Sequence, residues 1–261
     1  MLNGAAALEG LLRRDRAVVI TALCAVVILS WLYLVASAGM ESHEMDGMTM
    51  PMMRAEWSPA YFAVMVAMWA VMMAAMMLPS AAPMILLHAT ILRRRQEQNG
   101  TLAATGLFVL GYVAVWAGFS LAASTLQWAL ASAVLLSPMM EITSKTVAAA
   151  LLVAAGIYQW TPLKHSCLRR CRSPLDFVLA YWREGNWGSF AMGLRHGAFC
   201  LGCCGVLMLL LFVGGLMNLA WVAGLAAFIL IEKAAPRGDW IGRFVGLGLV
   251  LWGLVDLLRL V

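Results

Sequence analysis

The stretch RHGAFCLGCC at residues 195–204 holds three of the six cysteines of the chain. On an α-helix, His196, Cys200 and Cys203 would project within an arc of about 80°, with Cys204 at its edge. Thiolates and imidazole are ligands that suit soft transition metals. The spacing therefore predicts a soft-metal site on one helix; in the alternative, the cysteines are small apolar residues that pack between helices.

A second group, KHSCLRRC, contains His165, Cys167 and Cys171, and the nearby basic residues are Lys164, Arg169, Arg170 and Arg172. Positive charge nearby favours the thiolate form of cysteine, which is the form that binds metals and attacks disulfides. The C-x3-C spacing differs from the C-x2-C of common zinc modules. We predict a second metal site or a redox thiol pair; the alternative is a basic interfacial loop with incidental cysteines.

A hydrophilic segment, ESHEMDGMTMPMM at residues 41–53, combines one histidine, three carboxylates and five methionines. Thioether sulfur is a soft ligand that suits Cu(I), and carboxylates add negative charge that attracts cations. We expect His43, Met45, Met48 and Met50 to collect Cu(I). In the alternative interpretation the segment is a flexible linker whose methionines lie on the membrane surface.

Methionines continue into the apolar segment that follows. Four of them fall within an arc of about 80° on one helix face, and two more lie on the adjoining face. The four are Met65, Met68, Met72 and Met76, and the two are Met73 and Met77. Met72 and Met76 could hand a soft ion inward, although such a stripe also suits ordinary helix packing. Pro79 and Pro83 predict a kink, and His88 follows near the expected boundary.

The elements that must position these groups are membrane helices. Hydrophobic residues make up 63% of the 261 residues and charged residues 12%, which is typical of an integral membrane protein. Segments of about 20 apolar residues can cross a bilayer. We predict an all-α bundle with seven spans, near residues 17–36, 58–88, 102–125, 145–161, 189–213, 216–233 and 240–260.

The basic residues predict the orientation, because Lys and Arg are retained on the cytoplasmic side. With a cytoplasmic N-terminus, all of the 18 basic residues face inward except Arg54, Lys145 and Arg259. The net charge of +5 is then a topological signal, and no nucleic-acid partner is expected. Residues 1–57 are interpreted as a signal-anchor helix plus an external segment, with cleavage after Ala36-Ser37-Ala38 as the alternative. Residues 58–261 form the membrane domain, with a cytoplasmic cysteine-rich basic loop at 162–186.

Three motifs, MMAAMMLPSAAPM, YQWTPLKHSCLRRCRSP and HGAFCLGCCGVLMLLLFVGGLMNLAWV followed by EK, carry a resemblance. Together they resemble a bacterial family of predicted metal-binding integral membrane proteins of unknown function, over about residues 58 to 260. The resemblance assigns to the family pattern Met76, Met77, Pro79, Pro83, Lys164, Cys167, Cys171, His196, Cys200, Cys203, Cys204, Asn218, Glu232 and Lys233. Gly205 departs from that pattern, which often has Trp there.

Together these features predict a multi-pass protein of the bacterial inner membrane that binds a soft metal and transfers or transports it. Copper(I) is the expected ion, with zinc or another soft metal as the alternative. The expected partners are the metal ion, the lipid bilayer and a metallochaperone or membrane complex. A thiol–disulfide redox protein and an assembly subunit of a larger complex are the alternative functions, and catalysis is not expected. Adjacent Glu232 and Lys233 predict an interfacial ion pair.

Overall fold

The computed structural model describes residues 2–44, 57–95, 101–137 and 140–259, with the side chains of α1 described over 16–37. The described residues are almost entirely helical, which confirms the all-α prediction. The helices are α1 (Leu2–Glu44), α2 (Pro59–Arg94), α3 (Thr101–Ser132), α4 (Lys145–Tyr158), α5 (Pro162–Arg172), α6 (Pro174–Tyr181), α7 (Gly185–Met208), α8 (Leu211–Gly214), α9 (Leu219–Ala234) and α10 (Gly238–Leu258).

Local chemistry explains several helix starts. The side chains of Ser58, Ser144, Thr161 and Asn218 accept hydrogen bonds from backbone N–H groups in the first turns of α2, α4, α5 and α9. Such caps satisfy donors that have no partner within the helix. Proline at the first helical position also favours the starts of α2 and α5, because its fixed φ suits a helix and its missing N–H costs nothing there.

Five segments are long and apolar enough to cross a membrane: 16–37 of α1, then α2, α3, α7 with α8, and α10. α4 and α5 are bent by 64° relative to each other and together could form a sixth crossing or a re-entrant loop. α9 has 16 residues, or about 24 Å of helix, which is less than the roughly 30 Å of a bilayer core. The membrane crossing predicted at residues 216–233 therefore stays a prediction.

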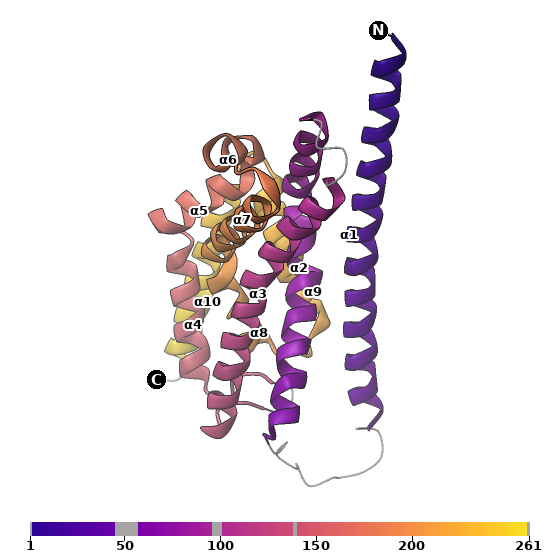
Figure 1. Cartoon of the computed structure of the whole chain (residues 1–261). Helices are drawn as coiled ribbons and strands as arrows, with labels where there is room; N and C mark the ends of the chain where they lie inside the picture. The colour runs from indigo at the N-terminus through magenta and orange to yellow at the C-terminus, as the bar shows by residue number, and fades with distance from the viewer. Residues whose placement is uncertain (1, 45–56, 96–100, 138–139, 260–261) are drawn as a thin grey trace.

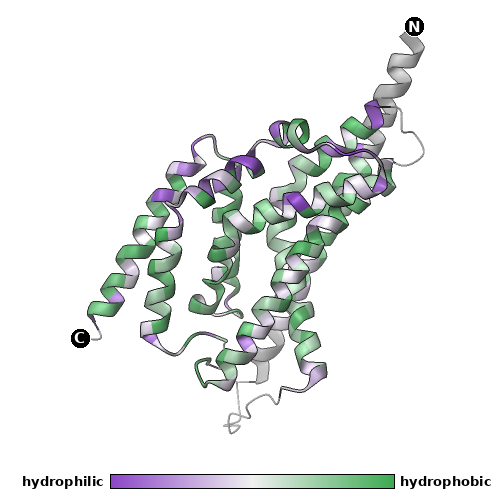
Figure 2. Ribbon diagram, turned by 60° about the vertical axis from the view of Figure 1, so that its left-hand side comes forward, coloured by the Kyte–Doolittle hydropathy of each residue, from purple (hydrophilic) through white to green (hydrophobic). Residues whose placement is uncertain are grey.

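The polar ends of the bundle lie together. Figure 1 places the N-terminal end of α1 at the same end of the molecule as α5 and α6. In Figure 2 hydrophilic residues gather at this upper end, and apolar residues cover the helix bodies. This arrangement matches the distribution of basic residues on which the predicted orientation rests.

Glycines allow the closest helix contacts. A Cβ on Gly193 of α7 would collide with the carbonyl oxygen of Phe108 in α3, and one on Gly111 would collide with that of Phe190. A Cβ on Gly156 of α4 would lie 2.6 Å from the carbonyl oxygen of Gly246 in α10. Small residues at such crossings let helix backbones approach within the membrane. The α3–α7 contact matters most for function, because it brings the middle of α3 against the cysteines of α7.

Candidate functional site

Five sulfur atoms from three helices meet in the interior of the bundle. Cys200 Sγ lies 3.9 Å from Cys204 Sγ, Cys204 Sγ lies 3.8 Å from Met77 Sδ, and Cys203 Sγ lies 3.8 Å from Cys171 Sγ. All five side chains are buried, and all four cysteines are free thiols. We call Met77, Cys171, Cys200, Cys203 and Cys204 the sulfur cluster.

Helix α7 supplies three of these sulfurs through its periodicity. Residues three and four apart on a helix are neighbours on one face. The thiols of Cys203 and Cys204 both donate to the carbonyl oxygen of Cys200, at 3.1 and 2.9 Å. These local bonds hold both side chains against the helix, so α7 presents its thiols as a compact group.

Two polar side chains contact Cys200. The ammonium group of Lys233 on α9 lies 3.0 Å from Cys200 Sγ and donates to Ser80 Oγ at 3.0 Å. Tyr112 Oη lies 3.1 Å from the same sulfur and donates its proton to the carbonyl oxygen of Met77 at 3.1 Å. An ammonium group beside a buried sulfur suits a thiolate, which is the metal-binding form of cysteine.

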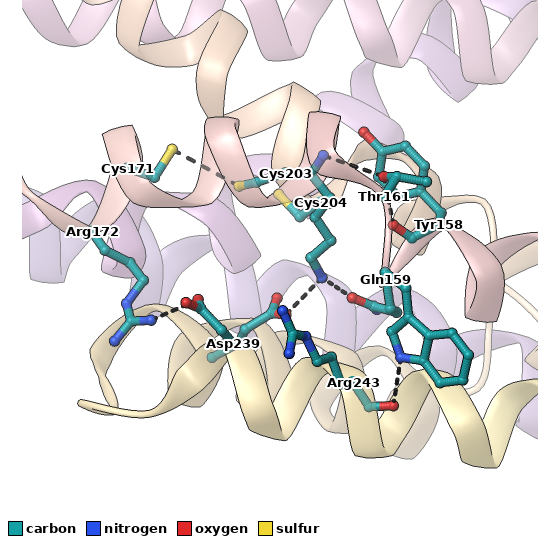
Figure 3. A network of polar contacts seen from close by, with 12 residues as sticks. Tyr158, Gln159, Thr161, Cys171, Arg172, Cys203, Cys204, Asp239 and Arg243 are labelled. Carbon is teal, nitrogen blue, oxygen red and sulfur yellow. Dashed lines mark hydrogen bonds and ion pairs between the residues drawn. The ribbon is translucent and has the colours of Figure 1, made fainter.

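A buried ion pair lies beside the cluster. Lys164 Nζ of α5 lies 2.6 Å from Glu232 Oε1 of α9, and both side chains are at most 2% exposed. Lys164 also donates to Gln159, and Arg172 forms an ion pair with Asp239 at 2.9 Å (Figure 3). The prediction that adjacent Glu232 and Lys233 pair with each other is wrong, because residues one apart on a helix point about 100° away from each other. Glu232 pairs with α5, and Lys233 contacts the sulfur cluster.

Helix α5 divides its three predicted site residues between two faces. Cys171 lies at Cys203, as Figure 3 shows. Cys167 packs on α7 so closely that a Cβ on Gly202 would lie 2.6 Å from its sulfur. His165 lies about 160° around the helix from Cys167 and about 120° from Cys171. It lines a surface cleft with Trp160, Pro162, Arg169, Asp239 and Arg243, away from the sulfur cluster.

Two buried histidines share an aromatic neighbour on α3. His196 is 2% exposed and packs against the rings of Phe108, Tyr112 and Phe177, with centroid distances of 5.2 to 6.1 Å. Its Nδ1 has no hydrogen-bond partner among the described residues. His88 is stacked against the same Phe108 ring at 4.8 Å, and neither of its ring nitrogens has a partner there. His196 precedes Cys200 by one turn of α7, whereas His88 follows Met77 by about three turns of α2.

Comparison with known families assigns this chain. A family model described as a copper chaperone, PpoB2, matches residues 66–255 and so covers most of the chain. The chain belongs to the PpoB2 copper chaperone family. The match includes the whole sulfur cluster and begins after the segment 41–53. No curated protein and no solved structure matches the chain.

Membership of the PpoB2 family agrees with the metal-binding half of the resemblance noted from the motifs. The family description names copper, where the motifs alone suggested a soft metal and an unknown function. Membership of this family supports copper binding or handling as the class of function. The roles of individual residues remain proposals that rest on the geometry.

The methionine that reaches the cluster differs from the two that we selected from the sequence. Met72 and Met76 are buried in α2, but the thioether beside Cys204 is that of Met77. Met77 is turned about 100° from Met76 and about 140° from Met72 on the helix. The predicted external copper ligands lie outside the described residues: Met45, Met48, Met50 and the side chain of His43. Their role in collecting Cu(I) therefore stays a prediction.

Neither Tyr112 nor Ser80 was predicted from the sequence: Tyr112 stands in no motif, and Ser80, although it lies within MMAAMMLPSAAPM, carries no soft-metal ligand. Lys233 was placed in the family pattern but not at the thiols. Its only local signal was a lysine within a long apolar segment, where a charge is costly and is usually paired or functional.

The sulfur spacing suits metal binding by a PpoB2 protein. Two sulfurs bound tetrahedrally to one ion at about 2.3 Å each lie about 3.8 Å apart. The three sulfur–sulfur distances of 3.8 to 3.9 Å match that value, so an ion could enter with little rearrangement. Within the described ranges, no three His, Cys, Asp or Glu side chains form a group that could hold a metal ion. A three-ligand site at Cys200 and Cys204 therefore needs the thioether of Met77.

Proposed function

We propose that this protein binds Cu(I) at the sulfur cluster and passes it on by ligand exchange within the membrane. The observation that carries the proposal is the row of three sulfurs from Cys200 through Cys204 to Met77, buried beside the ammonium group of Lys233. Family membership supports copper as the ion. The rest of the proposal follows from the chemistry of the donors.

The donor set favours Cu(I) over harder ions. Thiolate and thioether ligands select Cu(I), and oxygen-rich sites select magnesium or calcium. Zinc sites in proteins take nitrogen, thiolate and carboxylate ligands and are tetrahedral. In the row of three sulfurs, one ligand is a thioether, which is a poor zinc ligand.

The charges also fit a monovalent ion. Cu(I) held by the thiolates of Cys200 and Cys204 carries one net negative charge. Lys233 supplies one positive charge 3.0 Å from Cys200. The loaded site is then neutral overall, which matters because an uncompensated charge in the bundle interior is expensive.

Transfer needs a second set of ligands within reach of the first. Cys203 is on the same face of α7 as Cys200, three residues away, and its thiol lies 3.8 Å from that of Cys171 on α5. Copper can therefore move from the Cys200–Cys204–Met77 row to the Cys203–Cys171 pair while it remains bound to sulfur. Since α5 carries many of the basic residues, this pair would be the step nearest the cytoplasm, with a metallochaperone or membrane complex as the partner and the bacterial inner membrane as the location.

The test is copper loading of the detergent-purified protein under anaerobic, reducing conditions. The wild type should retain Cu(I) with copper–sulfur distances near 2.3 Å by X-ray absorption. The double variant Cys200→Ser/Cys204→Ser should lose it. Cys24→Ser is the matched control, because Cys24 is a free thiol on the exposed surface of α1. Equal copper in all three proteins would refute the proposal.

The same preparation separates copper transfer from the redox alternative. The Cys171–Cys203 contact could also close into a disulfide between α5 and α7. If the protein instead works by thiol–disulfide exchange, Cys171→Ser or Cys203→Ser should trap a mixed disulfide with a partner. Under that outcome copper content would not depend on the cysteines.

A further inference from the structure

Two more methionine sulfurs converge at the opposite end of the bundle from α5 and α6. Met65 lies in the first part of α2, and Met140 lies in the connection between α3 and α4. Gln127 Nε2, near the end of α3, lies 3.6 Å from Met65 Sδ and 3.1 Å from Met140 Sδ. Trp69 Nε1 donates to Gln127 Oε1 at 2.8 Å, which fixes the orientation of the amide.

This arrangement marks a position that suits a soft cation. An amide N–H carries partial positive charge, and both thioethers turn their lone pairs toward it. The lone pairs of Met65 and Met140 therefore converge on one point. Copper(I) seeks the same lone pairs, because thioether sulfur is one of its preferred ligands.

Gln127 is a buried polar residue of α3. Its side chain is 1% exposed, on the same helix face as the buried Ser120 and Ser124. The indole N–H of Trp69 accounts for the amide oxygen, whereas the amide nitrogen donates to two thioethers, which are weak acceptors. A buried amide in a membrane bundle is costly and is usually functional.

The backbone at Met140 is also unusual. Its φ of 55° is in the left-handed region, where glycine or asparagine would be less strained. A hydrogen bond from its N–H to the carbonyl oxygen of Ser137, at 2.9 Å, helps to hold this conformation. The segment between α3 and α4 is also held against α8 by a hydrogen bond from the N–H of Ile142 to the carbonyl oxygen of Phe212, at 2.8 Å. The strain thus coincides with the residue whose thioether faces Gln127.

We propose that Met65 and Met140 form a two-thioether Cu(I) site, and that the Gln127 amide occupies the ion's position when the site is empty. The choice of ion rests on the proposed function of the sulfur cluster. Both ligands are neutral, so the site holds copper less tightly than the thiolates and exchanges it faster. It is a place of entry or exit.

The distance to the sulfur cluster is short enough for a relay. Met65 precedes Met77 by 12 residues, which is about 18 Å along the axis of α2. Between them α2 carries four further buried methionines: Met68, Met72, Met73 and Met76. An ion that leaves the two-thioether site therefore meets thioether sulfur at each turn before it reaches Cys204.

The inference is tested by NMR of the full-length protein with 13C-labelled methionine methyl groups, in detergent, titrated with Ag(I) as a redox-stable probe of the same softness. After the sulfur cluster has filled, the methyl signals of Met65 and Met140 should shift together. Met65→Leu should abolish the shift of Met140, and Met140→Leu that of Met65. Met192→Leu, a buried methionine in the first half of α7, should leave the paired response intact.

Two outcomes separate this inference from the proposed function. If Ag(I) fills the cysteines but the signals of Met65 and Met140 stay in place, the two-thioether site does not exist and the sulfur cluster stands alone. If the paired shift occurs in wild type and persists in Cys200→Ser/Cys204→Ser, but the wild-type cysteines bind no metal, the cluster proposal fails and the outer site stands. Independent responses of the two methionines would also overturn the inference.

Discussion

Replacing Lys233 by leucine tests the charge balance of the sulfur cluster. The substitution removes the ammonium group that lies 3.0 Å from Cys200 Sγ and adds no sulfur ligand. A Cu(I) dithiolate has one net negative charge, about half of it on each sulfur. Half a charge at 3.0 Å from the ammonium is worth about 2.8 kcal/mol at an effective dielectric constant near 20. That energy corresponds to about a hundredfold loss of Cu(I) affinity.

The assay is competition with a colorimetric Cu(I) chelator under anaerobic conditions, with the dissociation constant measured for each variant. Lys233→Arg keeps the charge and should bind closer to wild type than Lys233→Leu. Lys145→Leu is the control for the loss of a positive charge, because Lys145 is exposed at the start of α4, remote in sequence and fold from the thiols. If Lys233→Leu binds as tightly as wild type, or more tightly, the ammonium competes with copper for Cys200 and our charge argument is wrong.

Three further substitutions test other parts of the geometry. Met77→Leu should weaken Cu(I) binding about tenfold by removing the thioether beside Cys204, whereas Met76→Leu on the neighbouring face should not, as the same competition assay would show. Glu232→Gln leaves a buried lysine without its carboxylate and should destabilise the protein by about 3 to 5 kcal/mol, seen as a lower unfolding temperature in detergent. Gly202→Ala places a methyl group 2.6 Å from a thiol sulfur of α5, so it should displace α5 and reduce cross-linking of the Cys171–Cys203 pair by a thiol-specific reagent of short reach.

Contacts within one helix could be predicted from the sequence, and contacts between helices could not. Cys200 and Cys204 are one turn apart, so helix periodicity alone brings their sulfurs to 3.9 Å. The contact of Cys171 with Cys203 depends on how α5 folds back after a 64° bend, and no local pattern encodes that angle. The same reason explains the choice of Met76 instead of Met77, because the rotation of α2 is set by packing.

Hydropathy located the apolar segments, but hydropathy alone does not determine which of them cross the membrane. The predicted spans near 58–88 and 102–125 fall within α2 and α3. The segment 216–233 became α9, whose 16 residues end at the polar network of Glu232 and Lys233. An apolar segment can form a helix that crosses the membrane or a shorter helix, such as α9, that places a charged side chain in the interior of the bundle. Hydropathy does not distinguish the two.

The two buried lysines near the cluster have opposite partners, and this difference explains how the site can hold a cation. Lys164 is matched by Glu232, so that pair adds no net charge and serves to join α5 to α9. Lys233 follows Glu232 directly but points to another face of α9. None of the ion pairs found among the described residues joins Lys233 to a carboxylate. Its nearest anionic candidate is Cys200, at 3.0 Å. Binding of Cu(I) to two neutral thiols adds one cation and releases two protons, so the site gains one negative charge on loading, and the ammonium group of Lys233 balances it. The bundle can therefore hold the copper dithiolate without burying an uncompensated anion.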